Sequence, residues 1–500
     1  MKSKLTLLFG IFSWLFSGII ASVTIFTGNI SFWYDPARDM LSAWNNLQKL
    51  TLIGPTSGIP GIFYGPYWIW WLSLSELFSK NPEFVTFIAM TLPYQIVFFT
   101  VLLLFGRLFG KFTSILLWLL FFAGYEGYFI QVWNPFLAPV LFLVVIYLFV
   151  FHISEHNRLK SFFILLFAGF LTGIAFNLQI SFSTGFIIGC LFYVIILGLF
   201  FEQSKAWFKK IAKIIFHVAA FFIGIVCAFF PFFLFEVRHG FLQTKTALVA
   251  LSKGGAVVAQ HGLSRPEILM QFFLQAKNFV QLPIILTIVL IALCTFLYIF
   301  FSCKKSAKIM SQEKKLLLLL CAITFSVLAI YLLAKNPVWN YHFVGFEVIW
   351  LLYFGLLAKR IPYARVMLAV ITIYVCFVTA RGFVSSLLVN PLTRGSLYTQ
   401  EYTVHLIQKN AGNKTYAVFA YSPSIYMYDY SYLFRFLANK NFSYDPGLVQ
   451  REKTVYLILP KGNQALLTDF IHFRTPDAFY KTVQKWQLPS GTTVIKRVAL

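Results

Sequence analysis

Long apolar runs separated by short polar segments occupy most of the chain. Eleven of these runs are long enough to cross the roughly 30 Å hydrocarbon core of a bilayer as helices. We therefore predict eleven membrane-spanning helices, at 5–27, 84–105, 112–129, 135–151, 161–178, 185–201, 211–235, 282–301, 316–333, 339–357 and 366–383. The first run follows Lys2 and Lys4, but it is too long for a signal peptide and lacks a convincing cleavage site, so we interpret it as an uncleaved anchor.

The pattern changes after the last apolar run. Residues 385–500 have the mixed composition of a soluble domain, large enough to fold on its own. Its hydrophobic periodicity predicts helices at 401–409 and 431–440 and strands at 415–420, 454–459 and 492–498. The predicted fold is thus an all-α polytopic membrane domain, 1–384, followed by a small α/β domain, 385–500.

Composition supports the membrane prediction. Hydrophobic residues make up 59% of the chain and charged residues 12%, and the mean hydropathy is +0.76. Soluble proteins carry about 25% charged residues. This chain has too little polar surface to cover a water-soluble globule of its size, because its 60 Phe residues cannot all be buried.

The basic residues indicate how the spans are oriented. The chain has 41 Lys and Arg against 17 Asp and Glu, a net charge of +24. With the N-terminus in the cytoplasm, six short inner segments hold 18 basic residues, whereas five outer loops with far more residues hold nine. An odd number of spans then places the C-terminal domain outside the inner (cytoplasmic) membrane. Nucleic-acid binding is disfavoured because no recognition module is present. The six cysteines show neither metal-ligand nor redox spacing.

The first outer loop, 28–83, has an unusual composition. It contains Ser-Phe-Trp-Tyr-Asp-Pro-Ala-Arg-Asp-Met at 31–40 and a segment rich in Gly and Pro, 54–67, that leads into three tryptophans. We predict a helix at 36–50 that starts with Pro36, is capped by Asp35 and lies flat on the membrane. Asp35, Arg38 and Asp39 then crowd together at positions i, i+3 and i+4.

These three charged side chains are the strongest candidates for chemistry. Two of the 17 carboxylates fall within five residues, flanked by Trp33, Tyr34 and Trp44. Aromatic faces beside a carboxylate suit a sugar, whose C–H faces stack while its hydroxyls form hydrogen bonds. The alternative is structural: Asp35 caps a helix, and the other two residues form an exposed pair that contributes about 0.2–0.5 kcal/mol. Both interpretations stay open on spacing alone.

The motif resembles that of a known family. An aromatic residue followed by Asp-x-x-Arg just after the first span, and then a Gly/Pro/aromatic segment ahead of the second, is similar to the GT-C superfamily of membrane glycosyltransferases. That superfamily includes protein O-mannosyltransferases, lipid A aminoarabinose transferases and bacterial family-39-like transferases. The resemblance covers residue motifs in the N-terminal part of the chain and, beyond them, the topology with its C-terminal outer domain.

The resemblance implies an activity and a site. GT-C members move a sugar from a polyprenyl-phosphate donor to an acceptor hydroxyl on the outer face, with inversion of the anomeric centre. Asp35 matches the family's first-loop carboxylate and would act as general base. Arg38, next to Asp39, would orient that base or hold a phosphate oxygen, and Trp33 and Tyr34 would contact the substrate. No cofactor or metal is implied. The partners would be the lipid-linked sugar, a glycan, lipid or protein acceptor, and the bilayer.

Several positions depart from the family's pattern. Pro36 stands where the family usually has Glu, and the second acidic site falls on Asn134, for which the nearby Glu126 is a substitute. The phosphate-binding segment matches only Tyr64 and its neighbours, without a lysine. Another cation must then meet the donor phosphate, and the outer-side candidates are Arg238, His239, Lys335 and His342. Each of these is equally well explained as a side chain at the membrane interface.

Two other functions remain as alternatives. A transporter or flippase of lipid-linked saccharides would need charges at mid-bilayer, broken helices and internal repeats, which are not evident in the sequence. A polymerase or ligase of lipid-linked glycans would use a long later outer loop rich in Arg and His, as loop 236–281 is. A nucleotide-sugar donor is disfavoured, because the glycines of 54–65 lack the Gly-Lys-Ser/Thr of a phosphate loop.

Overall fold

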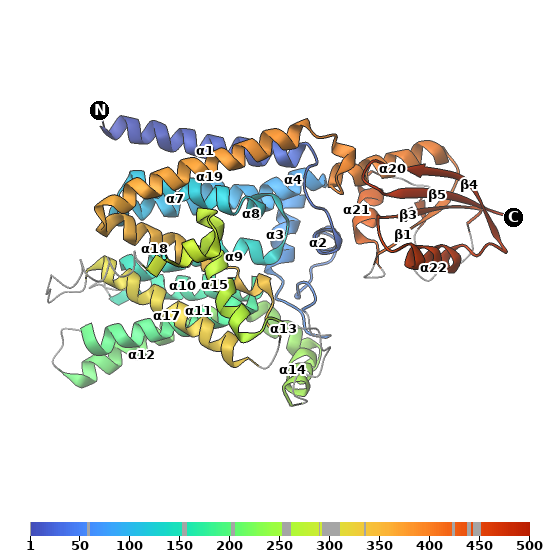
Figure 1. The fold of residues 1–500 in the computed structure, drawn as a ribbon. Coiled ribbons are helices and arrows are strands. Elements are labelled where there is room, and N and C mark those ends of the chain that lie inside the picture. The colour runs from blue at the N-terminus through green and yellow to red at the C-terminus, as the bar shows by residue number, and fades with distance from the viewer. Residues whose placement is uncertain are drawn as a thin grey trace.

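The computed structural model describes residues 2–57, 61–152, 158–201, 206–252, 262–289, 291–292, 311–334, 337–422, 426–437, 442–443 and 452–500. Figure 1 shows a bundle of long helices and, at one end of the bundle, a small domain built around a sheet. The N-terminus lies at the other end of the bundle.

Nine helical stretches in the described part of the chain are long and apolar enough to cross a membrane. The second of them changes its hydrogen-bond register through two π-helical turns, where Pro93 lacks an N–H. The nine stretches contain α1 (Lys2–Phe26); α4 (Pro82–Thr86), η1 (Phe87–Thr91), η2 (Pro93–Phe98), α5 (Phe99–Leu104) and α6 (Gly106–Phe109) as one span; α9 (Asn134–His152); α10 (Arg158–Leu178); α11 (Ile180–Ile196) with η3 (Leu197–Phe201); α12 (Trp207–Ala228); α17 (Gln312–Leu333); η4 (Asn340–Phe343) with α18 (Phe346–Arg360); and α19 (Pro362–Leu388).

The multi-pass membrane class is confirmed, but the predicted number of eleven spans is not. The run 112–129 is divided into α7 (Lys111–Gly124), which has 14 residues, and the short α8 (Gly127–Ile130). At the break, Gly124 lies against α15 (Arg265–Val280), where a Cβ would come within 2.9 Å of the Asn278 carbonyl oxygen. The run 282–301 is helical at 284–289 and 291–292, and the rest of its C-terminal half lies outside the described residues.

Small residues let neighbouring spans approach closely. A Cβ at Gly169 of α10 would lie 1.9 Å from the Phe221 carbonyl oxygen of α12, and one at Gly224 of α12 would lie 2.0 Å from the Leu166 carbonyl oxygen of α10. Helices that meet backbone to backbone gain van der Waals contact where lipid offers no hydrophobic driving force. The two glycines therefore hold α10 and α12 together as a pair.

The C-terminal domain is a five-stranded sheet with helices, as the predicted α/β class requires. The sheet has the order β2-β1-β3-β5-β4, with β1 parallel to β2 and β3, and with β5 antiparallel to β3 and β4. Its elements are α20 (Leu397–Ala411), β1 (Tyr416–Ala420), α21 (Tyr428–Phe436), β2 (Phe442–Ser443), β3 (Thr454–Leu459), α22 (Gln464–Arg474), β4 (Tyr480–Gln487) and β5 (Thr493–Ala499). The strands β1 and β3 are buried along nearly their whole length, which explains their continuous apolar sequence.

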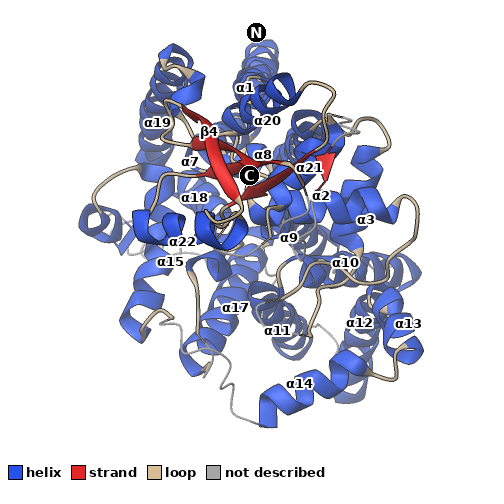
Figure 2. Cartoon of the chain, turned by 90° about the vertical axis from the view of Figure 1, so that its right-hand side faces the viewer, coloured by secondary structure: helices blue, strands red, loops and turns tan. Residues whose placement is uncertain are grey.

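Backbone hydrogen bonds tie this domain to the start of the first outer loop. The Leu397 N–H donates to the Ile30 carbonyl at 3.0 Å, and the Tyr398 N–H donates to the Gly28 carbonyl at 3.1 Å. Gly28 has a φ of +64°, and a Cβ there would lie 2.9 Å from the Cβ of Tyr398, so the close approach requires glycine. Figure 2, which faces this end of the molecule, shows the strands in front of the helical bundle.

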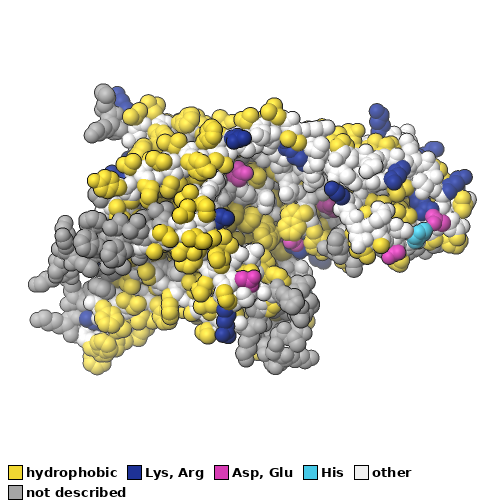
Figure 3. Space-filling view, in the orientation of Figure 1, with side chains coloured by type: hydrophobic (Ala, Val, Ile, Leu, Met, Phe, Trp, Pro, Cys, Tyr) yellow, Lys and Arg dark blue, Asp and Glu magenta, His cyan; other side chains and the backbone are white. Residues whose placement is uncertain are grey.

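The bundle and the C-terminal domain differ in the kind of side chains on their surfaces. Hydrophobic side chains cover much of the bundle in Figure 3, whereas charged side chains gather on the C-terminal domain. Large apolar side chains on α1, α12 and α19 are exposed, among them Leu5, Phe222 and Phe377. A lipid-facing surface accounts for this distribution, because a soluble protein rarely exposes so large an apolar area.

Candidate active site

The helix α2 (Tyr34–Asn46) carries the three charged side chains of the first outer loop. Trp33 occupies its N-cap position with an extended backbone, φ −120° and ψ −170°, and Asp35 lies in the first helical turn. The predicted cap by Asp35 and the predicted range 36–50 are therefore wrong by a few residues. In the first turn, the Asp35 carboxylate still faces the positive end of the helix dipole.

The apolar side of α2 packs on protein and not on lipid. Met40 and Ala43 are fully buried, and the Asn46 side chain donates to the Ser73 hydroxyl of α3 (Tyr67–Glu76) at 2.8 Å. Helix α21 of the C-terminal domain also packs against α2. The expectation that this face of the helix lies flat on the membrane is wrong, because α3 and α21 supply the apolar partners.

An ion-pair network joins the three charged side chains. Arg38 Nη1 lies 2.8 Å from Asp35 Oδ1. Arg38 Nη2 lies 2.7 Å from Asp39 Oδ1, to which Arg38 Nε also donates at 2.8 Å. The Asp35 side chain is 25% exposed, that of Arg38 17% and that of Asp39 1%. Asp35 is therefore the carboxylate that a substrate can reach, and Asp39 anchors the guanidinium from inside.

Burial raises the pKa of both carboxylates, and that of the enclosed Asp39 strongly. Loss of water raises the pKa of Asp39 to about 6, while Arg38 and the Trp68 indole N–H, which donates to Asp39 Oδ2 at 2.9 Å, oppose the rise. Partial burial also raises the pKa of Asp35, and the charge of Arg38 lowers it. Asp39 thus holds Arg38 in place, and Arg38 orients Asp35.

Aromatic rings surround this network. The Arg38 guanidinium lies 5.6 Å from the centre of the Tyr34 ring. The ring of Trp33 packs edge-on against Trp133 at 6.0 Å, and Trp133 contacts Tyr341 at 5.6 Å. The structure therefore brings the predicted substrate contact Trp33 together with two aromatic residues from later segments, while the other predicted contact, Tyr34, lies against Arg38.

Tyr64 joins the same cluster from the Gly- and Pro-rich segment. Burial above all, together with the nearby Tyr341 and the negative charge of Asp35, raises its pKa to about 12, and the charge of Arg38 opposes this rise. The phenol therefore stays protonated at neutral pH and can donate a hydrogen bond to a sugar hydroxyl or a phosphate oxygen close to Asp35.

Two glycines position Tyr64. The Gly54 N–H donates to the Tyr64 carbonyl at 2.7 Å, and the Tyr64 N–H donates to the Pro55 carbonyl at 2.9 Å, so the two stretches run side by side. A Cβ at Gly54 would lie 2.2 Å from the Gly65 carbonyl oxygen, and one at Gly65 would lie 1.8 Å from Asn177 Oδ1 at the end of α10. The glycines of this segment serve close packing.

The predicted second acidic site takes no part in the ion-pair network. Asn134 is buried at the start of α9, and its side-chain amide donates to the Leu178 carbonyl at 2.6 Å. Glu126 is exposed between α7 and α8. In the described part of the chain, neither side chain forms a hydrogen bond or an ion pair with Asp35, and their substrate-binding roles stay predictions.

The candidate cations for the donor phosphate are scattered. Arg238 and His239 are exposed at the end of α13 (Phe230–Arg238), where His239 Nδ1 lies 2.8 Å from the Phe235 carbonyl oxygen. Lys335 lies outside the described residues. His342 follows Tyr341, and its Nδ1 accepts a hydrogen bond from the Trp339 N–H at 3.2 Å. Their roles toward a phosphate stay predictions.

The sequence analysis missed a contribution from the C-terminal domain. Tyr428, in the first turn of α21, packs edge-on against Tyr34 with the ring centres 5.0 Å apart, and Tyr426 stacks on Tyr428 at 5.4 Å. The cluster Tyr-Met-Tyr-Asp-Tyr at 426–430 was the available signal. Its proximity to Tyr34 depends on docking between segments almost 400 residues apart, which no local pattern contains.

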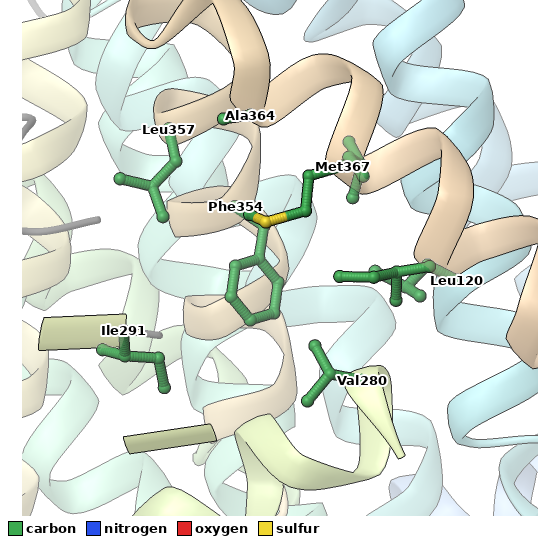
Figure 4. A pocket seen from close by; sticks show the side chains of 9 residues that line it. Leu120, Val280, Ile291, Phe354, Leu357, Ala364 and Met367 are labelled. Carbon is green, nitrogen blue, oxygen red and sulfur yellow. The ribbon is translucent and has the colours of Figure 1, made fainter. Parts of the chain in front are cut away.

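Other features of the described chain offer less chemistry. No group of three or more His, Cys, Asp or Glu side chains that could hold a metal ion occurs among the described residues. Figure 4 shows a cavity between α7, α18 and α19. It is lined by apolar side chains: Leu120, Val280, Ile291, Phe354, Leu357, Ala364, Met367, Leu368 and Ile371. These side chains provide neither acid, base nor phosphate ligand.

Comparison with solved structures identifies the architecture. No protein-family model matches the sequence, and no curated protein matches it. Two crystal structures of ArnT from Cupriavidus metallidurans match the whole molecule, one in the apo state and one bound to undecaprenyl phosphate. Each has a TM-score of 0.59 at 9% sequence identity, with 99% of this chain and 98% of that chain covered. The chain has the GT-C fold.

This fold confirms the predicted fold class and agrees with the architecture that the resemblance implied. At 9% identity the match establishes the architecture, so the chemistry has to be argued from the residues of this chain. Those residues are the Asp35–Arg38–Asp39 network and the tyrosines around it.

Proposed function

We propose that this chain is an inverting glycosyltransferase that moves a sugar from a polyprenyl-phosphate donor to an acceptor hydroxyl on the outer face of the membrane. The observation that carries the proposal is the partly exposed Asp35, ion-paired to a buried Arg38–Asp39 couple and surrounded by aromatic rings. A carboxylate held in one orientation beside rings suited to a sugar is what general-base catalysis of glycosyl transfer needs.

The class of donor is supported by the fold. One of the two matching ArnT structures holds undecaprenyl phosphate. A multi-pass bundle of the same architecture gives a lipid-linked donor access from the bilayer, and the site lies at the end of the bundle that carries the C-terminal domain. We therefore propose a polyprenyl-phosphate sugar as donor.

The ion-pair network assigns a role to each charged residue. Asp35 takes the proton of the acceptor hydroxyl as that oxygen bonds to the anomeric carbon. The bond from the anomeric carbon to the lipid phosphate breaks on the opposite face, and the phosphate leaves with the bonding electrons, which inverts the centre. All three Arg38 nitrogens face carboxylate oxygens, so Arg38 serves to orient Asp35, and Asp39 locks Arg38.

The test is the substitution Asp35→Asn in the full-length protein in nanodiscs. The amide keeps the shape of the side chain and removes the proton acceptor. We expect transfer of label from polyprenyl-phosphate sugars to a lipid extract to fall at least about a hundredfold. This factor is the lower end of the rate acceleration that a general base typically contributes. The matched control is Asp469→Asn, which changes an exposed carboxylate on α22 and should leave transfer unchanged.

The result also separates the alternative functions. A flippase would move the labelled lipid between leaflets and leave the sugar attached to it. A polymerase or ligase would lengthen or move a lipid-linked glycan instead of a single sugar. Near-normal transfer by Asp35→Asn, with loss of transfer in Asp39→Asn, would show that the base lies one helical turn further along α2.

A further inference from the structure

Two tyrosines of the C-terminal domain extend the aromatic surface beside Asp35. Tyr428 packs edge-on against Tyr34, whose ring also lies against the Arg38 guanidinium. Tyr426 stacks on Tyr428 with an angle of 17° between the ring planes, and 44% of Tyr426 is exposed. A continuous row of rings therefore runs from the ion-pair network to an accessible face on the C-terminal domain.

This tyrosine pair is held firmly against the membrane domain. The Gln400 side-chain amide donates both to the Phe32 carbonyl at 2.8 Å and to Asp429 Oδ2 at 2.9 Å, which links α20, the first outer loop and α21. The Arg435 guanidinium of α21 lies 4.3 Å from the centre of the Trp44 ring of α2. Because Asp429 and Arg435 fix α21 against the first outer loop and α2, Tyr428 at the start of α21, and Tyr426 stacked on it, are preorganised for binding.

The local charge indicates what kind of molecule fits. The carboxylates of Asp35, Asp39 and Asp429 lie in this region, and Arg38 is already committed to the first two. An anionic group placed on the tyrosine pair would be repelled by these carboxylates. The Arg38 guanidinium could not compensate, because it is already paired with Asp35 and Asp39. A neutral sugar carries no such penalty, and its C–H face packs on a phenol ring while its hydroxyls bond to polar groups.

We propose that the acceptor of this chain is a carbohydrate whose sugar ring packs on Tyr426 and Tyr428 while its reacting hydroxyl faces Asp35. This inference rests on the proposed function and adds the chemical class of the acceptor. The donor then approaches from the bilayer, and the acceptor approaches along the C-terminal domain. The two substrates meet at Asp35 from different sides, as an inverting transfer requires.

The first test measures sugar binding directly. The full-length protein in nanodiscs is mixed with N,N′-diacetylchitobiose, a neutral disaccharide, and saturation-transfer NMR reports which sugar protons touch protein. We expect saturation of the ring C–H protons with the wild type and with Asp35→Asn. Tyr426→Ala should weaken binding about tenfold, which corresponds to about 1.4 kcal/mol, whereas Tyr426→Phe should keep it within about twofold.

The matched control is Tyr402→Ala, which removes an exposed tyrosine from α20. Tyr402 lies two residues after Gln400 on the same helix, and each helical residue turns by about 100°. Its side chain therefore points away from the contact that Gln400 makes with the Phe32 carbonyl. Disaccharide binding should be unchanged in this variant. The melting temperature of each variant shows whether the domain still folds.

The second test measures transfer as the amount of acceptor extract is varied. Tyr426→Ala should need about tenfold more extract for half-maximal transfer, whereas Tyr402→Ala should need the same amount as the wild type. If the wild type transfers label but Tyr426→Ala behaves like Tyr402→Ala in both tests, the carbohydrate proposal is wrong and the proposed function stands. If the disaccharide binds at Tyr426 but no label moves, the proposed function is wrong and the carbohydrate site stands.

Two further probes can overturn the acceptor class. A short Thr-containing peptide or glycerol 3-phosphate replaces the disaccharide in the NMR measurement. Binding of either probe that is lost in Tyr426→Ala, with no binding of the disaccharide, would show that the tyrosine pair recognises a protein or an anionic acceptor and would refute the proposal.

Discussion

Asp35 and Asp39 stand four residues apart on one helix, yet burial gives them different roles. Asp35 keeps a quarter of its side chain exposed, whereas Asp39 is enclosed and bonded to both Arg38 and Trp68. Breaking a buried ion pair by removing one partner costs about 3–5 kcal/mol, because the remaining charge is left without compensation. The residue that must stay charged for chemistry is thus kept accessible, and the residue that must stay fixed is buried.

The titration of Asp39 predicts how transfer depends on pH. Burial raises the pKa of this group to about 6, so below that pH it becomes neutral and no longer holds Arg38 by charge. We expect kcat/KM to fall as the pH is lowered through about 6. In Asp39→Asn this step should be absent, and transfer should lie between about tenfold and a hundredfold below the wild-type plateau, because a displaced Arg38 misorients Asp35.

Unfolding would not produce the same pH profile. The folded-state pKa of Asp39 lies above its ordinary value, so the folded chain binds more protons between about pH 6 and 4, and protonation of this group stabilises it. Asp429, whose pKa burial also raises to about 6, acts in the same direction. Because protonation of these two groups stabilises the folded chain, the melting temperature should stay constant or rise as the pH is lowered, while transfer falls. A melting temperature that fell in parallel with transfer would contradict the prediction.

At the scale of elements, the Gly- and Pro-rich segment and α10 determine where Tyr64 lies. Gly54 packs on backbone, whereas Gly65 packs on the side chain of Asn177, whose amide donates to the Gly173 carbonyl at 2.7 Å. Overpacking a tight contact costs about 1–3 kcal/mol. The two glycines should therefore respond differently when the neighbour on α10 is made smaller.

We predict that Gly54→Ala and Gly65→Ala each lower the melting temperature and reduce transfer at least about tenfold, because Tyr64 is displaced. Adding Asn177→Ala should restore much of the loss in Gly65→Ala, since the obstructing Oδ1 is removed. It should restore nothing in Gly54→Ala, which clashes with a carbonyl oxygen. Gly395→Ala, which meets no atom within 4 Å, is the control. Rescue of both variants, or of neither, would contradict this account.

At the scale of the whole molecule, the C-terminal domain and the N-terminus lie at opposite ends of the bundle. From this arrangement we predict an odd number of crossings, in which α7 and the run 282–301 are either both counted or both left out. The basic residues of the sequence then indicate which end is cytoplasmic. On this basis we predict that the end of the bundle that carries the candidate site faces outward.

Reporter fusions check this orientation. Alkaline phosphatase needs the oxidising outer compartment for its disulfides, so a fusion after Leu500 should be active. Green fluorescent protein fused before Met1 should fluoresce, as it does in the cytoplasm. An inactive phosphatase fusion after Leu500, together with a non-fluorescent fusion before Met1, would invert the topology and move Asp35 to the inner face.

Much of the fold was predictable because the length and apolar character of each run, which decide whether it can lie in lipid, are visible in the local sequence. A run of apolar residues long enough to cross hydrocarbon must be helical wherever it packs, so most spans and the membrane class followed from the sequence. The division of the run 112–129 did not, because it depends on how Gly124 meets α15. In the C-terminal domain, β4 was missed because its side chains are mostly exposed and show no apolar alternation.

The charged core of the site was also predictable, since Asp35, Arg38 and Asp39 lie within one helical turn of each other. What the sequence could not supply is the difference between the two carboxylates, because the burial of Asp39 arises from α3 through Trp68. Nor could it bring Tyr428 to Tyr34, a contact that exists only because α21 docks on α2. Local patterns encode solvation and spacing along the chain, whereas burial and long-range contact depend on which distant segments pack together.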